Sequence, residues 1–385
     1  MLKKITYFVS VERLTIGIIG GIFSPLIPLV ANDLKVGLEY IGAAISLSTI
    51  GLLFITLLIG NLTDIWGFKK VIILGIILIL FGEIGLFFSH YYQIFIISYL
   101  ILSIGLGIID ISTLSLVGYF SYENKLKNII KTSIFATIGS TVAPLLVSLI
   151  LKIKLTWQFL YLYLIIPQII MAIMLIFIKT PEKIKRRSLK VIFQNNQIIF
   201  KRPFFLLYCF SLLIYSSLLT TFSTWFTTYF TGLNIELNLS SVFLSIYMLS
   251  LLLGLILKNY LIKFIKEKKL IVISLLLSLI FFIFIFFINI IVIKIILIFL
   301  FGLNISGIFS MIYSLGLDLD NEYINTASSL MFLFNYLGII IFQFLSGYFS
   351  EHFSKNSILY IDIVLLFLIF IISIVIYNKS KPKII

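Results

Sequence analysis

Charged residues are scarce in this chain. Only 11% of its 385 residues are Asp, Glu, Lys or Arg, while 61% are hydrophobic. A typical soluble domain carries roughly 25% charged residues. One water-soluble core of this size cannot bury so much apolar surface, so lipid must cover the remainder. The composition therefore excludes a soluble protein and predicts an integral membrane protein.

Residues that bind metals or form cross-links are also rare. The chain has one cysteine, Cys209, and two histidines, His90 and His352, which are far apart in the sequence. A disulfide framework and a thiolate metal site cannot form from these residues, and a histidine metal site is disfavoured. We therefore expect no metal and no cofactor.

Several function classes lack their sequence signatures. No Gly-x-x-x-x-Gly-Lys-Ser/Thr loop occurs, so ATP-driven pumping would require a partner subunit. The net charge of +14 comes from short basic clusters between apolar runs, which argues against nucleic-acid binding. A receptor would need an appended signalling domain, and a membrane-embedded enzyme would need a polar cluster at a membrane face. The sequence shows neither, so we expect no enzymatic activity.

Long hydrophobic runs are abundant, and twelve of them reach the roughly 20 residues that a spanning helix needs. The first contains Glu12, Arg13, Pro25 and Pro28 and is too long for a signal-peptide core, so we expect it to be a retained helix. The predicted spans are 5–31, 38–62, 71–89, 92–119, 126–151, 157–178, 204–231, 239–262, 270–289, 291–317, 323–350 and 357–377.

The longest connection, 179–203, divides the chain into an N-terminal bundle at 1–178 and a C-terminal bundle at 204–385. Its basic and apolar residues fit either a short helix on an anionic membrane surface or a solvated basic loop. Most other Lys and Arg fall on the same side of the membrane as this linker, which predicts that both termini are cytoplasmic. We expect a multi-pass protein of a prokaryotic plasma membrane.

The two groups of six spans repeat weakly in sequence. Four residues of the first half recur at one common offset in the second half, in equivalent spans: Gly105 and Leu106 as Gly302 and Leu303, and Asn128 and Phe135 as Asn325 and Phe332. Parallel repeats of this kind are a known transporter architecture with the substrate site between the halves. We therefore predict an all-α membrane fold of two pseudo-symmetric six-helix bundles.

The connection between the second and third spans carries the most specific motif. It reads Gly-Asn-Leu-Thr-Asp-Ile-Trp-Gly-Phe-Lys-Lys from Gly60 to Lys70. This resembles the loop signature of the major facilitator superfamily, although arginine often stands there in place of Ile65 and Phe68. The resemblance implies the twelve-helix fold of that superfamily and a gate loop in which the acid faces the eleventh span near Asn325. The gate-loop residues would be Gly60, Asp64, Gly67, Lys69 and Lys70.

Two features of drug–proton antiporters of that superfamily are missing. Ile101 stands where they carry an arginine four residues before a glycine, and the glycines expected after Pro144 are absent. Asp110 in the fourth span instead resembles the acid that couples protons in the sugar–proton symporter branch that includes fucose permease. The resemblance implies a proton-coupled secondary transporter of a small polar solute such as a sugar, expected to be a monomer. An exporter of drugs or other amphipathic compounds is the alternative.

Ionisable groups inside a span are costly and tend to be functional. At about 1.5 Å per residue, Arg13 lies roughly 13 Å and Asp110 roughly 15 Å from the cytoplasmic ends of their spans. We predict that Asp110, Arg13 and Glu12 form a proton-coupling site in which protonation breaks an ion pair. A static ion pair that only fixes helix packing is the competing interpretation. Glu83 and Asp362 are weaker candidates, and Asp362 is expected to reach the outer interface.

Neutral polar and aromatic side chains in the second half could line a substrate site. Each of them is individually more typical of helix–helix hydrogen bonding or packing. The candidates are Asn304, Asn335, Gln343, Trp225, Tyr247 and Tyr336. Together they permit a polar, uncharged solute.

Overall fold

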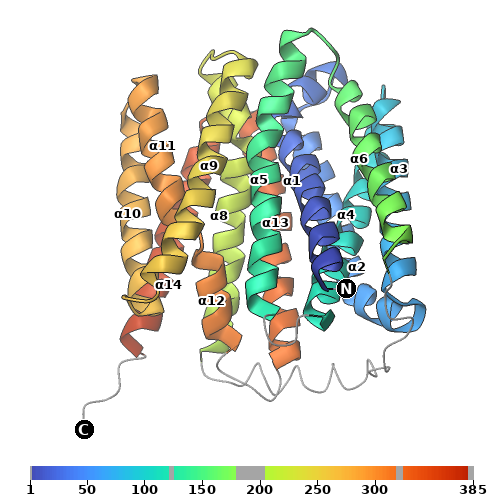
Figure 1. Ribbon diagram of the computed structural model, residues 1–385. Helices are drawn as coiled ribbons and strands as arrows, with labels where there is room; N and C mark the ends of the chain where they lie inside the picture. Colours follow the sequence, from blue (N-terminus) through green and yellow to red (C-terminus); the bar gives the residue numbers. More distant parts are fainter. Residues whose placement is uncertain (1, 121–124, 179–203, 318–323, 380–385) are drawn as a thin grey trace. The chain divides into compact units, whose positions relative to one another are not determined.

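The computed structural model describes residues 2–120, 125–178, 204–317 and 324–379, and the regular structure of these residues is helical throughout (Figure 1). In the first half the helices are α1 (Leu2–Asp33), α2 (Leu38–Trp66), α3 (Phe68–Phe87), α4 (Tyr92–Phe120), α5 (Lys125–Lys152) and α6 (Gln158–Ile176). In the second half they are α8 (Phe205–Gly232), α9 (Leu237–Leu261), α10 (Glu267–Phe287), α11 (Ile291–Ile305), α12 (Ile308–Leu317), α13 (Ile324–His352) and α14 (Ser357–Lys379).

Twelve segments of the described chain are long and apolar enough to cross a membrane. Each coincides with a predicted span, with ends that differ by a few residues, so the predicted all-α fold with twelve spans is confirmed. Helices this apolar on every side are stable because lipid solvates the faces that the protein does not cover. The predicted basic linker, 179–203, lies outside the described residues.

The tenth predicted span differs from expectation in one respect. A single helix was expected over 291–317, whereas the structure has α11 and α12 in its place. Ser306 and Gly307 separate them, and Gly307 has a φ of +72°, a conformation that interrupts a right-handed helix and that glycine adopts without steric cost.

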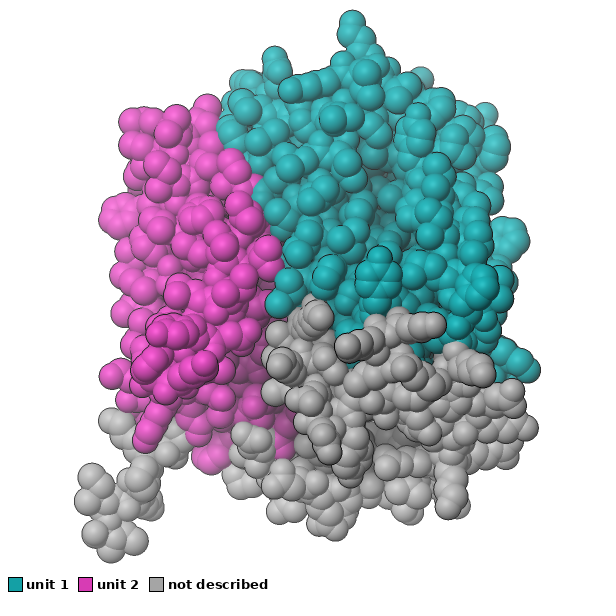
Figure 2. Space-filling model, viewed as in Figure 1, with its two compact units in different colours: residues 1–187, 226–245 teal, residues 188–225, 246–385 magenta. Residues whose placement is uncertain are grey.

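Two compact units are coloured separately in Figure 2. Unit 1 comprises residues 1–187 and 226–245, and unit 2 comprises residues 188–225 and 246–385. Within unit 1, Thr227 Oγ1 at the end of α8 donates to Ser24 O of α1 at 2.7 Å. Ser148 of α5 also forms a hydrogen bond with Asn238 of α9. The turn between α8 and α9 is therefore held by polar contacts with α1 and α5. The bundle boundaries at 178 and 204 stay a prediction.

Helices α1 and α5 of unit 1 pack along each other through glycines. A Cβ atom at Gly17 would overlap the carbonyl oxygen of Ala136, and one at Gly139 would overlap that of Leu14. Small residues of this kind let the backbones of two membrane helices approach closely. Unit 2 contains a similar contact, in which Gly338 of α13 lies against Leu213 O of α8.

The glycine contact between α1 and α5 can be tested with two neighbouring glycines. Gly17→Ala is expected to lower the melting temperature by about 5 °C, because overpacking a tight contact costs roughly 1–3 kcal/mol. Gly20→Ala is the matched control, because a Cβ at Gly20 would meet no atom within 4 Å. A fluorogenic thiol dye would report unfolding of the detergent-purified protein through Cys209, the sole cysteine, which is buried. Equal melting temperatures for the two variants would contradict the packing argument.

Candidate functional site

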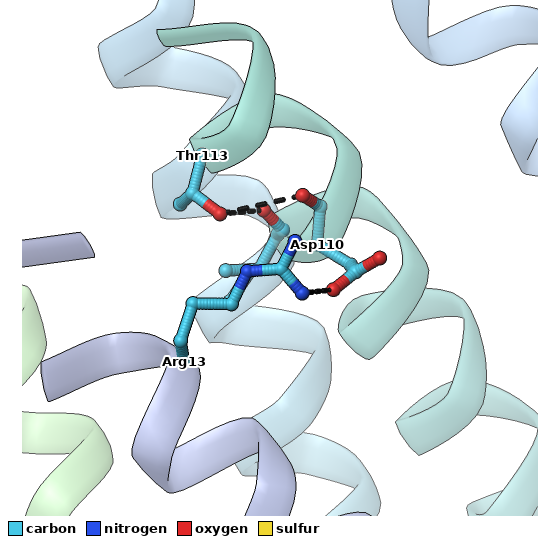
Figure 3. Close-up of polar contacts among 4 residues, drawn as sticks. Arg13, Asp110 and Thr113 are labelled. Atoms are coloured by element: carbon cyan, nitrogen blue, oxygen red, sulfur yellow. Dashed lines mark hydrogen bonds and ion pairs between the residues drawn. The ribbon is translucent and has the colours of Figure 1, made fainter. Parts of the chain in front are cut away.

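An ion pair between α1 and α4 is the centre of the site. Arg13 Nη1 donates to Asp110 Oδ1 (Figure 3). The Arg13 side chain is 8% exposed, while that of Asp110 is 40% exposed. The two residues that the depth argument placed together are thus in contact. Their role in proton coupling stays a prediction.

Glu12 adds a second acid beside this pair. Its side chain is 1% exposed, and neither of its carboxylate oxygens has a hydrogen-bond donor in bonding geometry. Thr113 lies near Glu12, but its hydroxyl donates to Ile109 O at 2.7 Å. The cluster therefore combines two carboxyl groups with one guanidinium group.

Thr113 is a member of this cluster that the sequence reasoning missed. It follows Asp110 by three residues on α4, and Figure 3 shows its hydroxyl beside the backbone of that turn. Residues three apart on a helix share a face, so the spacing alone would have placed Thr113 next to the acid.

The predicted gate loop is a tight turn between α2 and α3. Gly67 has a φ of +80°, and its N–H donates to Thr63 O at 2.9 Å. Lys69 Nζ donates to Ile176 O, the last residue of α6, at 3.0 Å, which places a cation at the negative end of that helix. Lys70 is exposed. Gly60 and Asp64 lie in the last two turns of α2, but their surroundings and those of Asn325 lie outside what the structure describes.

Three of the predicted substrate residues are engaged in packing between α8 and α13. Trp225 Nε1 donates to Gln343 Oε1 at 2.9 Å, and Gln343 Nε2 donates to Thr224 Oγ1 at 3.0 Å. Asn335 accepts a hydrogen bond from Ser216. Tyr247 is fully buried in α9. These side chains already bind protein groups, and their contact with a solute stays a prediction.

Asn304 and Tyr336 differ from these, because both are partly exposed. Tyr336 stacks on Phe332, with ring centroids 6.4 Å apart. Phe332 in turn contacts Tyr313 at 5.4 Å, and Tyr313 stacks on Phe309 at 5.8 Å. All four rings are partly exposed, and together they form an aromatic row on α12 and α13. The sequence reasoning missed three of them, although the spacing of four residues within each pair was a visible signal.

Two further acids in the spans are buried. Asp362 was expected at the outer interface, but it is fully buried and its Oδ1 accepts a hydrogen bond from Thr221 Oγ1 at 2.5 Å. The expectation was wrong because the position of a residue along α14 does not determine which face it occupies. Glu83 in α3 is also fully buried, and neither of its carboxylate oxygens has a hydrogen-bond partner.

Twelve apolar spans with an ion pair and a further acid between two of them are features of a membrane transporter. The family model of the Major Facilitator Superfamily matches residues 13–343. The chain therefore belongs to the Major Facilitator Superfamily, as the gate-loop motif predicted, and superfamily members are transporters rather than enzymes. None of the curated proteins matches the chain.

Several solved structures share the fold. The E. coli fucose:proton symporter FucP has a TM-score of 0.68 and 15% identity, with 98% of each chain covered. A D-xylose-proton symporter has a TM-score of 0.81 and 12% identity, with 96% of each chain covered. The nucleoside transporter NupG has a TM-score of 0.76 and 17% identity, with 98% of this chain and 100% of that chain covered. Identities this low show the common fold alone.

Proposed function

We propose that this protein is a secondary active transporter that moves a small polar organic solute, such as a sugar, together with protons across a prokaryotic plasma membrane. The observation that carries the proposal is the cluster of Glu12, Arg13 and Asp110 in unit 1. With both carboxyl groups ionised, the cluster has one negative charge that its guanidinium group does not compensate. An uncompensated charge inside a membrane is costly, so the binding of one proton stabilises the cluster.

Proton binding also changes the contacts of Arg13. A neutral Asp110 holds the guanidinium group less strongly than a carboxylate does, because the charge-assisted hydrogen bond is lost. The partly exposed Asp110 side chain gives a proton a route to the pair, while Arg13 and Glu12 are buried. Protonation would thus loosen α4 from α1 and couple proton binding to a change in helix packing.

The aromatic row in unit 2 supports a solute with a ring. Phe309, Tyr313, Phe332 and Tyr336 offer partly exposed ring faces on which a sugar or a nucleobase can pack. Asn304 of α11 adds a polar side chain. The solutes in the names of the fold neighbours are fucose, xylose and nucleosides, which are all polar ring compounds. We place both termini in the cytoplasm on the basis of the basic flanks, and we expect a monomer.

Reconstitution into liposomes tests this function. Radiolabelled hexoses, pentoses and nucleosides would be offered to proteoliposomes with and without an inside-alkaline pH gradient. We expect at least one solute to accumulate above its external concentration only when the gradient is present, and a protonophore to abolish this accumulation. Liposomes without protein are the control. Uptake that is the same with and without the gradient for every solute would overturn the proposal. Gradient-driven extrusion of amphipathic dyes alone would also overturn it and would favour the exporter alternative.

A further inference from the structure

The break in the tenth span exposes backbone oxygens inside unit 2. In a continuous helix the carbonyl groups of Asn304, Ile305 and Ser306 would each accept a hydrogen bond from the N–H group four residues later. Because α11 ends at Ile305 and Gly307 has a φ of +72°, this pattern is interrupted. Each interrupted carbonyl needs another donor, because an unsatisfied polar group is costly in a membrane protein.

Side chains of two other helices supply these donors. Lys258 Nζ, from α9, donates to both Asn304 O and Ser306 O. Tyr215 Oη, from α8, donates to Ile305 O at 3.0 Å. All three carbonyls at the end of α11 are thus satisfied by side chains, which is the arrangement of a built site rather than of a frayed helix end.

Lys258 fits this position as a cation. It is 5% exposed. A helix carries partial negative charge at its C-terminal end, and the ammonium group lies at that end of α11. A Cβ atom at Gly307 would lie 3.3 Å from Lys258 Cδ, so the lysine stem runs along the break itself. Transporters with interrupted helices use such freed carbonyls to coordinate monovalent cations.

We propose that Lys258 is a tethered cation and a positioning residue. Its ammonium group occupies a cradle of carbonyl oxygens from Asn304 and Ser306 and thereby fixes the break between α11 and α12. The cradle accepts a free primary ammonium ion when the lysine side chain is shortened. By fixing the break, Lys258 also holds Asn304, a candidate substrate residue, in position to contact the solute. Only this last step rests on the proposed function.

Chemical rescue tests the cradle directly. In detergent, Lys258→Ala is expected to lower the melting temperature by roughly 5 °C, because buried carbonyl groups lose their donor. We expect n-propylammonium to restore at least half of this loss. Tetramethylammonium at the same concentration should restore none, because it carries a positive charge but no N–H donor. Lys263→Ala is the matched control: Lys263 is exposed in the connection after α9, so neither its melting temperature nor its response to amines should differ from the parent protein.

Two further variants keep the proposal testable if Lys258→Ala does not fold. Lys258→Arg keeps a cationic donor and should stay close to the parent melting temperature, whereas Lys258→Met keeps the stem and should lose stability without amine rescue. A Lys258→Met variant as stable as the parent protein, or a Lys258→Ala loss that no primary ammonium ion reverses, would overturn the tethered cation. The melting experiments do not depend on any transported solute, so a failed uptake assay leaves their outcome interpretable.

Discussion

Asp110→Asn is expected to reduce pH-driven uptake by about 100-fold or more. An amide cannot bind or release a proton and forms no charge-assisted hydrogen bond with Arg13, so the proposed coupling step is lost. Here Arg13, 8% exposed, would keep its charge without the carboxylate that it now contacts. Initial rates of uptake into proteoliposomes, with and without an imposed pH gradient, measure the effect. Asp362→Asn is the matched control, because it changes another acid within a span, and an amide oxygen can retain the hydrogen bond that Asp362 accepts from Thr221.

A double variant separates proton coupling from a static packing role. Arg13→Gln combined with Asp110→Asn removes both members of the ion pair, so the variant tests the role of the pair without leaving Arg13 separated from its partner. If the pair couples protons, the double variant exchanges solute across the membrane but accumulates none in response to the gradient. Uphill uptake restored by the double variant would show instead that the pair only fixes the packing of α1 against α4.

Cross-linking the α8–α9 turn to α5 is expected to stop transport completely. Ser148 and Asn238 form a hydrogen bond within unit 1, so the pair Ser148→Cys and Asn238→Cys brings two thiols close together. A short bis-methanethiosulfonate linker should join them. Ser148 belongs to the predicted N-terminal bundle and Asn238 to the predicted C-terminal bundle, and in an alternating-access cycle the two bundles move against each other. Uptake is measured before treatment, after treatment and after reduction. Recovery on reduction shows that the linkage, and not damage, causes the loss.

The single-cysteine variants are the controls for this experiment. Each carries one of the two introduced thiols, and the native Cys209 is buried, so the reagent should not inhibit either of them. Full transport activity in a quantitatively cross-linked protein would contradict a moving contact between α5 and the α8–α9 turn.

Helix positions were predictable from sequence because the physical requirement is simple. A membrane span must be long and apolar, and this requirement placed all twelve spans within a few residues of their ends in the structure. The proximity of Arg13 and Asp110 was predictable for a related reason: depth in the membrane follows directly from residue number along a helix. Both arguments use only the length, the composition and the residue numbering of each helix by itself.

Features that depend on the neighbours of a helix were not predictable. Asp362 was misplaced because depth does not reveal that its side chain meets Thr221 of α8. The break at Gly307 was missed because glycine is common inside membrane helices, so a Ser-Gly pair in an apolar run marks no boundary. The donors that stabilise the break, Lys258 and Tyr215, lie 48 and 90 residues before the carbonyls of Ser306 and Ile305 that they satisfy.

The pairing of Arg13 with Asp110 also sets a problem for biosynthesis. The two residues are separated by 97 positions, so α1 leaves the ribosome well before α4 exists. At a translation rate of roughly 5–20 residues per second, the first helix waits on the order of 5–20 seconds for its partner. During that interval the insertion machinery must keep Glu12 and Arg13 out of the lipid, or the two side chains must neutralise each other. Premature release into lipid would expose two ionisable groups to hydrocarbon, so the proposed coupling site also makes the insertion of α1 costly.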